Sequence, residues 1–265
     1  MRLGYSPMTA RMLDSEQAFR LAAELALDFV ELAFDLHEVL PHLQDPRRVR
    51  ELTRATGVGT TLHLAFVDLN LASLMPLARR AAVERTLAGL AYADEVGATC
   101  GVLHTGMNYL RHPQADALAA RALEAALTEV AGAGAGVPIV LENLALGEDD
   151  LVRTPEELRD LTDRHGMRNC LDFGHAHVQG TRDGFAAIDA YLETLGERIT
   201  HLHLHGNHGG SDEHLPTDQG TLDYAPYAPY LAGFRGTVCL EIGSTGEAGV
   251  RASVAHLRAL MGSAA

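Results

Sequence analysis

Acidic and imidazole side chains recur at the ends of short apolar runs in this 265-residue sequence. Glu142, Asp172 and Glu241 each end such a run. Burying an unpaired carboxylate is costly, and neighbouring carboxylates repel one another unless protons or a cation neutralise them. Histidines share these positions: His63, His104, His175, His201, His203 and His205 lie at or just after the runs, and Asp212 and His214 follow in one loop. The combination predicts a divalent-metal site.

The ligand types narrow the identity of the ion. Mixed imidazole and carboxylate ligands suit Zn²⁺, Mn²⁺ or Co²⁺, and we expect one to three ions of Mn²⁺ or Zn²⁺. No GxGxxG segment follows the first expected strand and no P-loop sequence occurs, so we expect no nucleotide cofactor. All 21 basic residues are arginine, which excludes Schiff-base lysine chemistry.

Eight short β-type runs would carry these side chains. They cover residues 2–6, 28–33, 59–64, 99–104, 138–142, 168–173, 199–205 and 237–242. Several are apolar throughout, such as Pro138-Ile139-Val140-Leu141, which is typical of strands buried on both faces. The polar residues gather at the carboxyl ends of the runs, and that end is the catalytic face of a parallel barrel.

Helical patterns separate the runs, at residues 15–27, 76–96, 117–130, 154–165, 183–195 and 247–261. Repeated strand–helix alternation predicts parallel strands with right-handed crossovers, and hence an α/β fold of the (β/α)8 TIM barrel class. A doubly wound open sheet is the competing architecture, and the missing nucleotide motif disfavours it. No linker interrupts the pattern, so residues 1–265 are expected to form a single domain.

The composition limits the partners of the chain. A formal net charge of −14 without any lysine disfavours duplex DNA, although a local basic patch would still permit it. No apolar run approaches the roughly 20 residues of a membrane-spanning helix, so we expect no membrane partner. The start lacks a secretory pattern, and Cys100, Cys170 and Cys239 are widely spaced, so we expect a cytoplasmic protein without disulfides. The sequence carries no signal of oligomeric state.

Short motifs at the expected strand ends carry a family resemblance across essentially the whole chain. They are His63-Leu64-Ala65-Phe66 with Asp68-Leu69-Asn70-Leu71, Leu141-Glu142-Asn143, Leu171-Asp172-Phe173-Gly174-His175, His201-Leu202-His203, Asp212-Glu213-His214-Leu215-Pro216 and Leu240-Glu241. In this order they resemble the xylose isomerase-like TIM barrel superfamily, which includes sugar phosphate isomerase/epimerases and the endonuclease IV-like enzymes of AP endonuclease family 2. Two departures concern loops: Gly206 replaces an acidic residue that often follows the seventh strand, and Thr217-Asp218-Gln219-Gly220 lacks one glycine of a Gly-x-Gly turn.

The resemblance implies two alternative ligand sets. The set shared by the epimerases corresponds to Glu142, Asp172, His203 and Glu241 around one Mn²⁺-like ion. The endonuclease IV branch adds further ligands and three zinc ions, and those ligands correspond to His63, His104, His175, Asp212 and His214. His203 is chosen by its place in the His-x-His pattern, and His201 or His205 could substitute for it.

Two reactions follow from the resemblance. In a sugar or sugar-phosphate isomerase/epimerase, a metal polarises the substrate carbonyl while Glu142 and Glu241 move a proton and His175 hydrogen-bonds the substrate. The alternative is a zinc or manganese phosphoesterase of the endonuclease IV type, with Glu142 and Asp172 bridging the ions. The acidic, lysine-free composition disfavours a nucleic-acid substrate and therefore narrowly favours the isomerase/epimerase, acting on a small sugar or sugar phosphate.

Four further residues are expected to line the substrate pocket. Phe66 would form a wall, and His205 would contact the substrate. Asn143 would donate to a substrate oxygen or cap the following loop. Glu31, at the end of the second run, would bind substrate or pair with an arginine.

Overall fold

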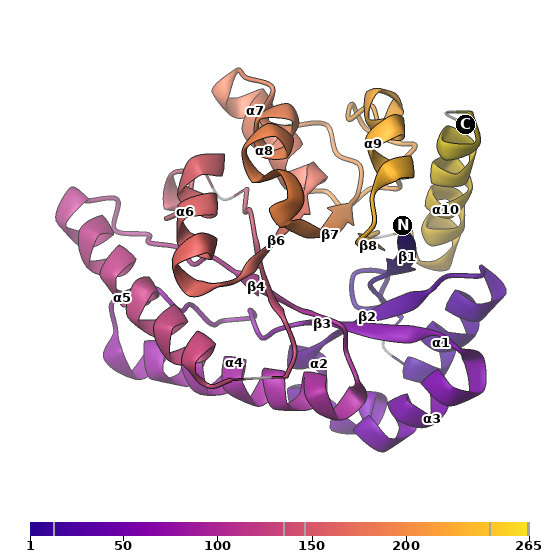
Figure 1. Ribbon diagram of the computed structural model, residues 1–265, viewed down its shortest axis with the longest axis horizontal. Coiled ribbons are helices and arrows are strands. Elements are labelled where there is room, and N and C mark those ends of the chain that lie inside the picture. Colours follow the sequence, from indigo (N-terminus) through magenta and orange to yellow (C-terminus); the bar gives the residue numbers. More distant parts are fainter. Residues whose placement is uncertain (13, 135, 146, 244, 264–265) are drawn as a thin grey trace.

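Eight parallel strands close into a barrel in chain order, as Figure 1 shows for a computed structural model that describes residues 1–12, 14–134, 136–145, 147–243 and 245–263. The strands are β1 (Arg2–Tyr5), β2 (Phe29–Ala33), β3 (Gly59–His63), β4 (Gly101–His104), β5 (Ile139–Glu142), β6 (Arg168–Asp172), β7 (Ile199–Leu204) and β8 (Thr237–Leu240). Pairing of β8 with β1 closes the ring, and this confirms the predicted barrel and excludes the open sheet.

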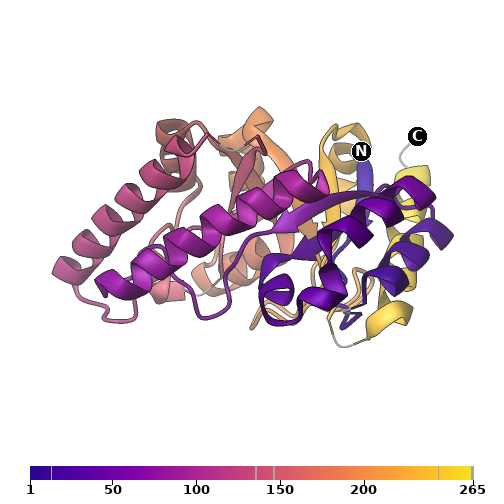
Figure 2. The same cartoon turned by 90° about the horizontal axis from the view of Figure 1, so that it is seen from below.

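Helices surround the barrel on its outside (Figure 1). They are α1 (Ser15–Glu24), α2 (Phe34–Val39), α3 (Pro46–Thr56), α4 (Pro76–Val96), α5 (Pro113–Gly132), α6 (Pro155–His165), α7 (Phe173–Asp183), α8 (Ala187–Leu195), α9 (Ala228–Gly233) and α10 (Gly246–Ser263). Short 3-10 turns cover Pro41–Gln44, Gly147–Asp149, Gly196–Arg198 and Ala225–Tyr227. Both views place the two termini near each other, with β1 beside α10 (Figures 1 and 2). No helix within the described ranges is both long and apolar enough to cross a membrane.

Local sequence signals explain where several helices begin and end. In α6, Thr154 accepts a hydrogen bond from the backbone N–H of Glu157, and the Glu157 side chain accepts from the Thr154 backbone, which forms a capping box. Gly166 then ends α6 in the left-handed region, at φ 64°. α4 follows the same logic, with Pro76 in its first turn and Gly97 at φ 74° after its last.

Four helices lie outside the ranges expected from the sequence: α2, α3, α7 and α9. α3 is rich in arginine and buries only Val49, so it lacks an apolar stripe that sequence periodicity could reveal. α7 contains Gly174 and Gly180, which weaken a helix in isolation, and it follows β6 without a loop. The expected helix at 183–195 is shorter, at Ala187–Leu195, because α7 extends to Asp183 and Gly184 ends it in the left-handed region, at φ 74°.

The strand register brings the polar residues to one end of the barrel. His63, His104, Glu142 and Asp172 are the last residues of β3 to β6. His104 pairs with Glu142 across β4 and β5, and Asp172 pairs with His203 across β6 and β7. Because all strands run in the same direction, these side chains converge at the carboxyl end of the barrel.

Candidate metal centre

Three adjoining groups of His, Asp and Glu side chains occupy the carboxyl end of the barrel. The first contains His63, His104 and Glu142, and the second contains Glu142, Asp172, His203 and Glu241. The third contains His175, His205, Asp212 and His214, and within each group one ligand atom per residue lies within 4.8 Å of the others. All nine sequence-predicted ligands therefore fall into these groups, and His205 joins them.

The first group meets at one oxygen of Glu142. The Nε2 atoms of His63 and His104 lie 3.6 and 3.3 Å from Glu142 Oε2. His63 Nδ1 lies 2.9 Å from the backbone oxygen of Leu64 and donates to it, which leaves Nε2 as a lone-pair donor toward the carboxylate. The Phe66 ring packs against both imidazoles, with ring centroids 4.5 and 5.0 Å away, and so covers one side of this group.

The second group surrounds His203 Nδ1. This nitrogen lies 3.0 Å from Glu142 Oε1, 3.4 Å from Glu241 Oε2 and 3.8 Å from Asp172 Oδ2. All four side chains are buried. Burial alone would raise the pKa of Glu142, but the positive charge and hydrogen bond of His203, together with the nearby imidazoles of His104 and His63, hold it well below its usual range. The Glu142 carboxylate is consequently ionised at neutral pH.

Glu31 lies in the middle of β2 and contacts Nε2 of His203, the ring nitrogen that faces away from the second group. Its two oxygens lie 3.0 Å from the Nε2 atoms of His203 and His201, and it accepts a 2.8 Å hydrogen bond from the Thr61 hydroxyl. Its side chain is fully buried. A carboxylate behind a ligating imidazole fixes which ring nitrogen is free for the ion. The position of Glu31 indicates that it orients His203, a contact that neither the substrate nor the arginine alternative anticipated.

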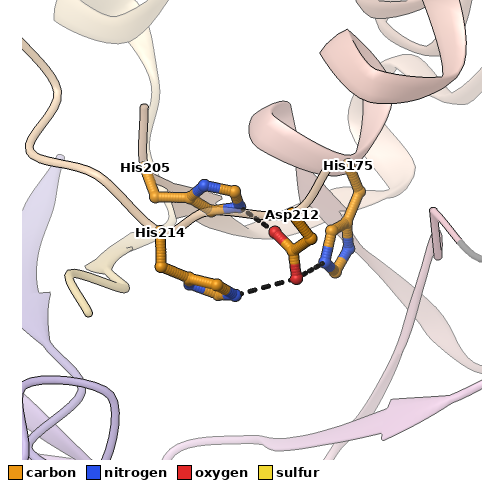
Figure 3. Close-up of side chains that lie close together, drawn as sticks. All are labelled: His175, His205, Asp212 and His214. Atoms are coloured by element: carbon orange, nitrogen blue, oxygen red, sulfur yellow. Dashed lines mark hydrogen bonds and ion pairs between the residues drawn. The ribbon is translucent and has the colours of Figure 1, made fainter. Parts of the chain in front are cut away.

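The third group links α7, the end of β7 and the following loop (Figure 3). Asp212 Oδ2 lies 3.3 Å from His175 Nε2 and 2.9 Å from His214 Nε2, while Asp212 Oδ1 lies 3.3 Å from His205 Nε2. Burial lowers the pKa of His214, but Asp212, Glu241 and Asp172 outweigh it and raise that pKa to about 9. His214 also adopts a positive φ of 50°, an uncommon conformation for a non-glycine residue that aims its ring into the group.

Asn143 ties two strand ends together. Its side-chain nitrogen donates to the backbone oxygen of Asp172 at 3.0 Å, and its side-chain oxygen accepts from the Asp172 N–H at 2.8 Å. Its backbone oxygen accepts from His175 Nδ1 at 2.9 Å. Asn143 therefore positions Asp172 and His175, a contact that neither the substrate nor the loop-cap alternative of the sequence analysis anticipated.

The side chains fit divalent ions. Glu142 Oε2, Asp172 Oδ2 and His205 Nε2 are buried without a hydrogen-bond partner among the described residues. A tetrahedral zinc ion holds nitrogen and oxygen ligands at about 2.0–2.1 Å, which places neighbouring ligands about 3.3 Å apart. The observed separations of 2.9 to 3.8 Å bracket that value. An ion in each group would satisfy these atoms and neutralise the clustered carboxylates.

Two deeper groups include thiols but are poor candidates. Cys170 lies with His201 and His203, and Cys239 lies with Glu31 and His203. Burial raises the pKa of both thiols well above the usual value, so they remain protonated. Since the thiolate is the ligand form, these cysteines pack the barrel interior.

Comparison with known proteins agrees with the architecture. A family model described as a xylose isomerase-like TIM barrel matches residues 19–260. The uncharacterized protein MJ1614 of Methanocaldococcus jannaschii is 27% identical over 84% of this chain and 85% of its own length. The structure of the TTHB071 protein from Thermus thermophilus, soaked with ZnCl2, is 28% identical with a TM-score of 0.75 and covers 99% of this chain and 98% of that one.

Two further solved structures share the fold. A D-tagatose 3-epimerase-like protein superposes with a TM-score of 0.82 at 22% identity, covering 99% of both chains. Endonuclease IV from Thermus thermophilus superposes with a TM-score of 0.70 at 21% identity, covering 99% of this chain and 100% of that one. Both reaction types weighed in the sequence analysis therefore occur on this architecture.

Proposed function

Because the chain belongs to the xylose isomerase-like TIM barrel family, we propose that it is a divalent-metal-dependent hydrolase of small phosphoesters. One observation carries the proposal. Glu142 Oε2 faces His63 and His104, whereas Glu142 Oε1 faces His203, so a single carboxylate joins two ligand groups. A bridging carboxylate between two ions is typical of two-metal phosphoester hydrolysis.

Each residue has a role in this scheme. His63 and His104 would hold one ion, and Asp172, His203 and Glu241 would hold the second, with Glu142 shared. Glu31 keeps His203 Nδ1 directed toward the second ion. When bound, such a pair of ions supplies activation of water and stabilisation of negative charge on the phosphoryl oxygens. Phe66 excludes solvent from one side of His63 and His104.

The charged groups near the mouth support a small substrate rather than duplex DNA. Arg111 lies in the loop between β4 and α5, and Arg153 lies in the loop between β5 and α6. Arg111 Nε lies 2.8 Å from Asp149 and its Nη1 lies 3.2 Å from Glu148. Arg153 donates to the backbone oxygens of Asp150 and Glu148, at 2.7 Å each. Both guanidinium groups are engaged within the protein, and a net charge of −14 without lysine offers little other attraction for a polyanion.

A sugar isomerase/epimerase is the second candidate, and one observation favours it. Glu142 Oε1 and Glu241 Oε2 lie 3.0 and 3.4 Å from His203 Nδ1, so the second group alone could serve a single ion with two carboxylates beside it. This was the narrow preference of the sequence analysis. It ranks second here because it gives His63, His104 and the third group no role, whereas the hydrolase uses the first two groups directly.

Activity screening of the metal-loaded protein separates the two candidates. We expect zinc- or manganese-dependent hydrolysis of p-nitrophenyl phosphate, bis-p-nitrophenyl phosphate or a small natural phosphoester, and no turnover in a panel of ketoses and ketose phosphates. An abasic-site oligonucleotide tests the DNA alternative in the same assay. Isomerisation of a ketose without phosphoester hydrolysis would overturn the proposal in favour of the second candidate.

The bridging role of Glu142 gives a sharper test. Glu142→Gln should lower kcat/KM by at least about a hundredfold, because stabilisation by a metal pair is worth several kcal/mol. The matched control is Glu197→Gln, an exposed residue at the opposite end of the barrel that should leave kcat/KM unchanged. An unimpaired Glu142→Gln enzyme would contradict the scheme.

A further inference from the structure

The ring of His205 is held between two carboxylates. It directly follows β7 and is fully buried. Its Nδ1 lies 3.3 Å from the backbone oxygen of Gly206, and its Nε2 lies 3.3 Å from both Asp172 Oδ1 and Asp212 Oδ1. Nε2 has no hydrogen-bond partner among the described residues. The sequence analysis assigned this residue to substrate contact, yet its free nitrogen points into the third group (Figure 3).

The surroundings fix this ring orientation. The His214 ring stacks on His205 with centroids 4.1 Å apart and planes 21° from parallel. On the α7 side, a Cβ on Gly174 would lie 2.0 Å from the His205 ring, so the imidazole fits only because residue 174 is glycine. A ring held this tightly is preorganised to ligate an ion.

The other imidazoles of the third group are oriented in the same way. His175 Nδ1 donates to the backbone oxygen of Asn143 and His214 Nδ1 donates to that of Glu241, at 2.9 Å each. Each therefore presents Nε2 toward Asp212. With His205, three imidazoles and one carboxylate place four ligand atoms within 4.8 Å of one another.

We infer that His205 closes the third site as a fourth protein ligand, so that an ion there is structural rather than a contact for substrate. Structural zinc sites have four protein ligands of their own, whereas catalytic sites keep a position open. The third group shares no residue with the other two, whereas the second reaches four only by sharing Glu142 with the first. The ion would anchor the loop that carries Asp212 and His214 to α7 and β7. The inference rests on the proposed function in one respect, because it leaves the first two groups to act on the substrate.

Cobalt substitution tests the closure without any substrate. Tetrahedral Co²⁺ absorbs visible light several times more strongly than five- or six-coordinate Co²⁺. We expect His205→Ala to weaken the third ion at least about tenfold in chelator competition, a loss already typical of partners outside the ligand set. The variant should also lose the strong tetrahedral band and gain a band that azide shifts, because a coordination position opens.

Two comparisons make the result specific. Imidazole added to His205→Ala should refill the position and restore the tetrahedral band. His42→Ala removes an exposed histidine that belongs to none of the three groups, and it should change neither the affinity nor the spectrum. If the variant fails to fold, the wild-type protein still decides the matter: with the first two sites filled by zinc and the third by cobalt, the spectrum should be tetrahedral and insensitive to azide.

An unchanged third-ion spectrum in His205→Ala would overturn the inference and assign His205 to hydrogen bonding between Asp172 and Asp212. A wild-type third ion that responds to azide would overturn it as well. The outcome is separable from that of the proposed function. A closed third site in a protein without phosphoesterase activity contradicts only the function, and an open third site in an active phosphoesterase contradicts only the closure.

Discussion

At the scale of single residues, the site depends on which nitrogen of each imidazole is free. His63, His175 and His214 each donate Nδ1 to a backbone oxygen at 2.9 Å and present Nε2. His203 is reversed, with Nε2 toward Glu31 and Nδ1 toward the other carboxylates. The residue types and their order could be predicted from the sequence. The tautomers could not, because the backbone oxygens that set them are brought into place only by the fold.

Glu31 should affect how tightly the second group binds an ion, because it orients His203. In Glu31→Gln, the amide no longer presents a carboxylate oxygen to each of His201 and His203, so His203 loses part of its orientation. We expect the second ion to bind about 10- to 100-fold more weakly, as is typical when the partner of a ligating histidine is removed. Chelator competition with zinc measures this loss, with Glu197→Gln as the control. Unaltered affinity for the second ion would assign Glu31 to packing alone.

The His214–Asp212 pair predicts how metal stabilisation depends on pH. The pKa of His214 rises from 6.5 to about 9, so without metal its pairing stabilises the fold below about 6.5 and is lost as pH rises through about 9. Metal replaces that proton. The increase in Tm on adding metal should therefore grow from pH 6.5 to 9, as calorimetry with and without chelator can measure. His214→Asn should flatten this dependence, and a metal-induced shift that shrinks with rising pH would contradict the assignment.

At the scale of elements, the eight strands were predictable because apolar runs and turn residues mark them clearly. Predicted and observed strand limits differ by two residues or fewer, as at β4, which begins at Gly101 rather than residue 99. α7 escaped prediction although it carries His175. Asp172 caps it through a 2.7 Å bond from the His175 N–H, so one side chain both ends β6 and begins the helix. A candidate ligand thus doubles as a helix cap, and no apolar periodicity signals that.

The close approach of α7 and His205 predicts an effect of a single methyl group. Gly174→Ala would place a Cβ 2.0 Å from the His205 ring, and the ring must move. We expect the third ion to bind at least about tenfold more weakly, while the first two ions are retained. Gly180→Ala is the matched control: it lies in the same helix, and its Cβ would lie 2.6 Å from the Phe185 backbone oxygen, away from the metal groups. Both variants should lower Tm, and equal retention of the third ion in both would contradict the packing argument.

At the scale of the whole molecule, barrel closure gathers side chains from residue 63 to residue 241 at one mouth. The order of the strands, and the alternation of side chains between the two faces of each strand, predict that these side chains meet. Their division into three groups was implied only by the family resemblance, because it depends on strand tilt and on the loop that carries Asp212. The proposed function departs from the narrow sequence-based preference for an isomerase because Glu142 faces both the first and the second group, and these distances can be read only from the folded barrel.

Metal content tests the central claim most directly. The purified protein, loaded with zinc and freed of excess ion by gel filtration, should contain close to three zinc ions per chain by inductively coupled plasma mass spectrometry, one for each group. Glu142→Gln should lower that number by depleting the first two sites, and Glu197→Gln should not. A wild-type protein that retains no more than one ion per chain would contradict the polynuclear account.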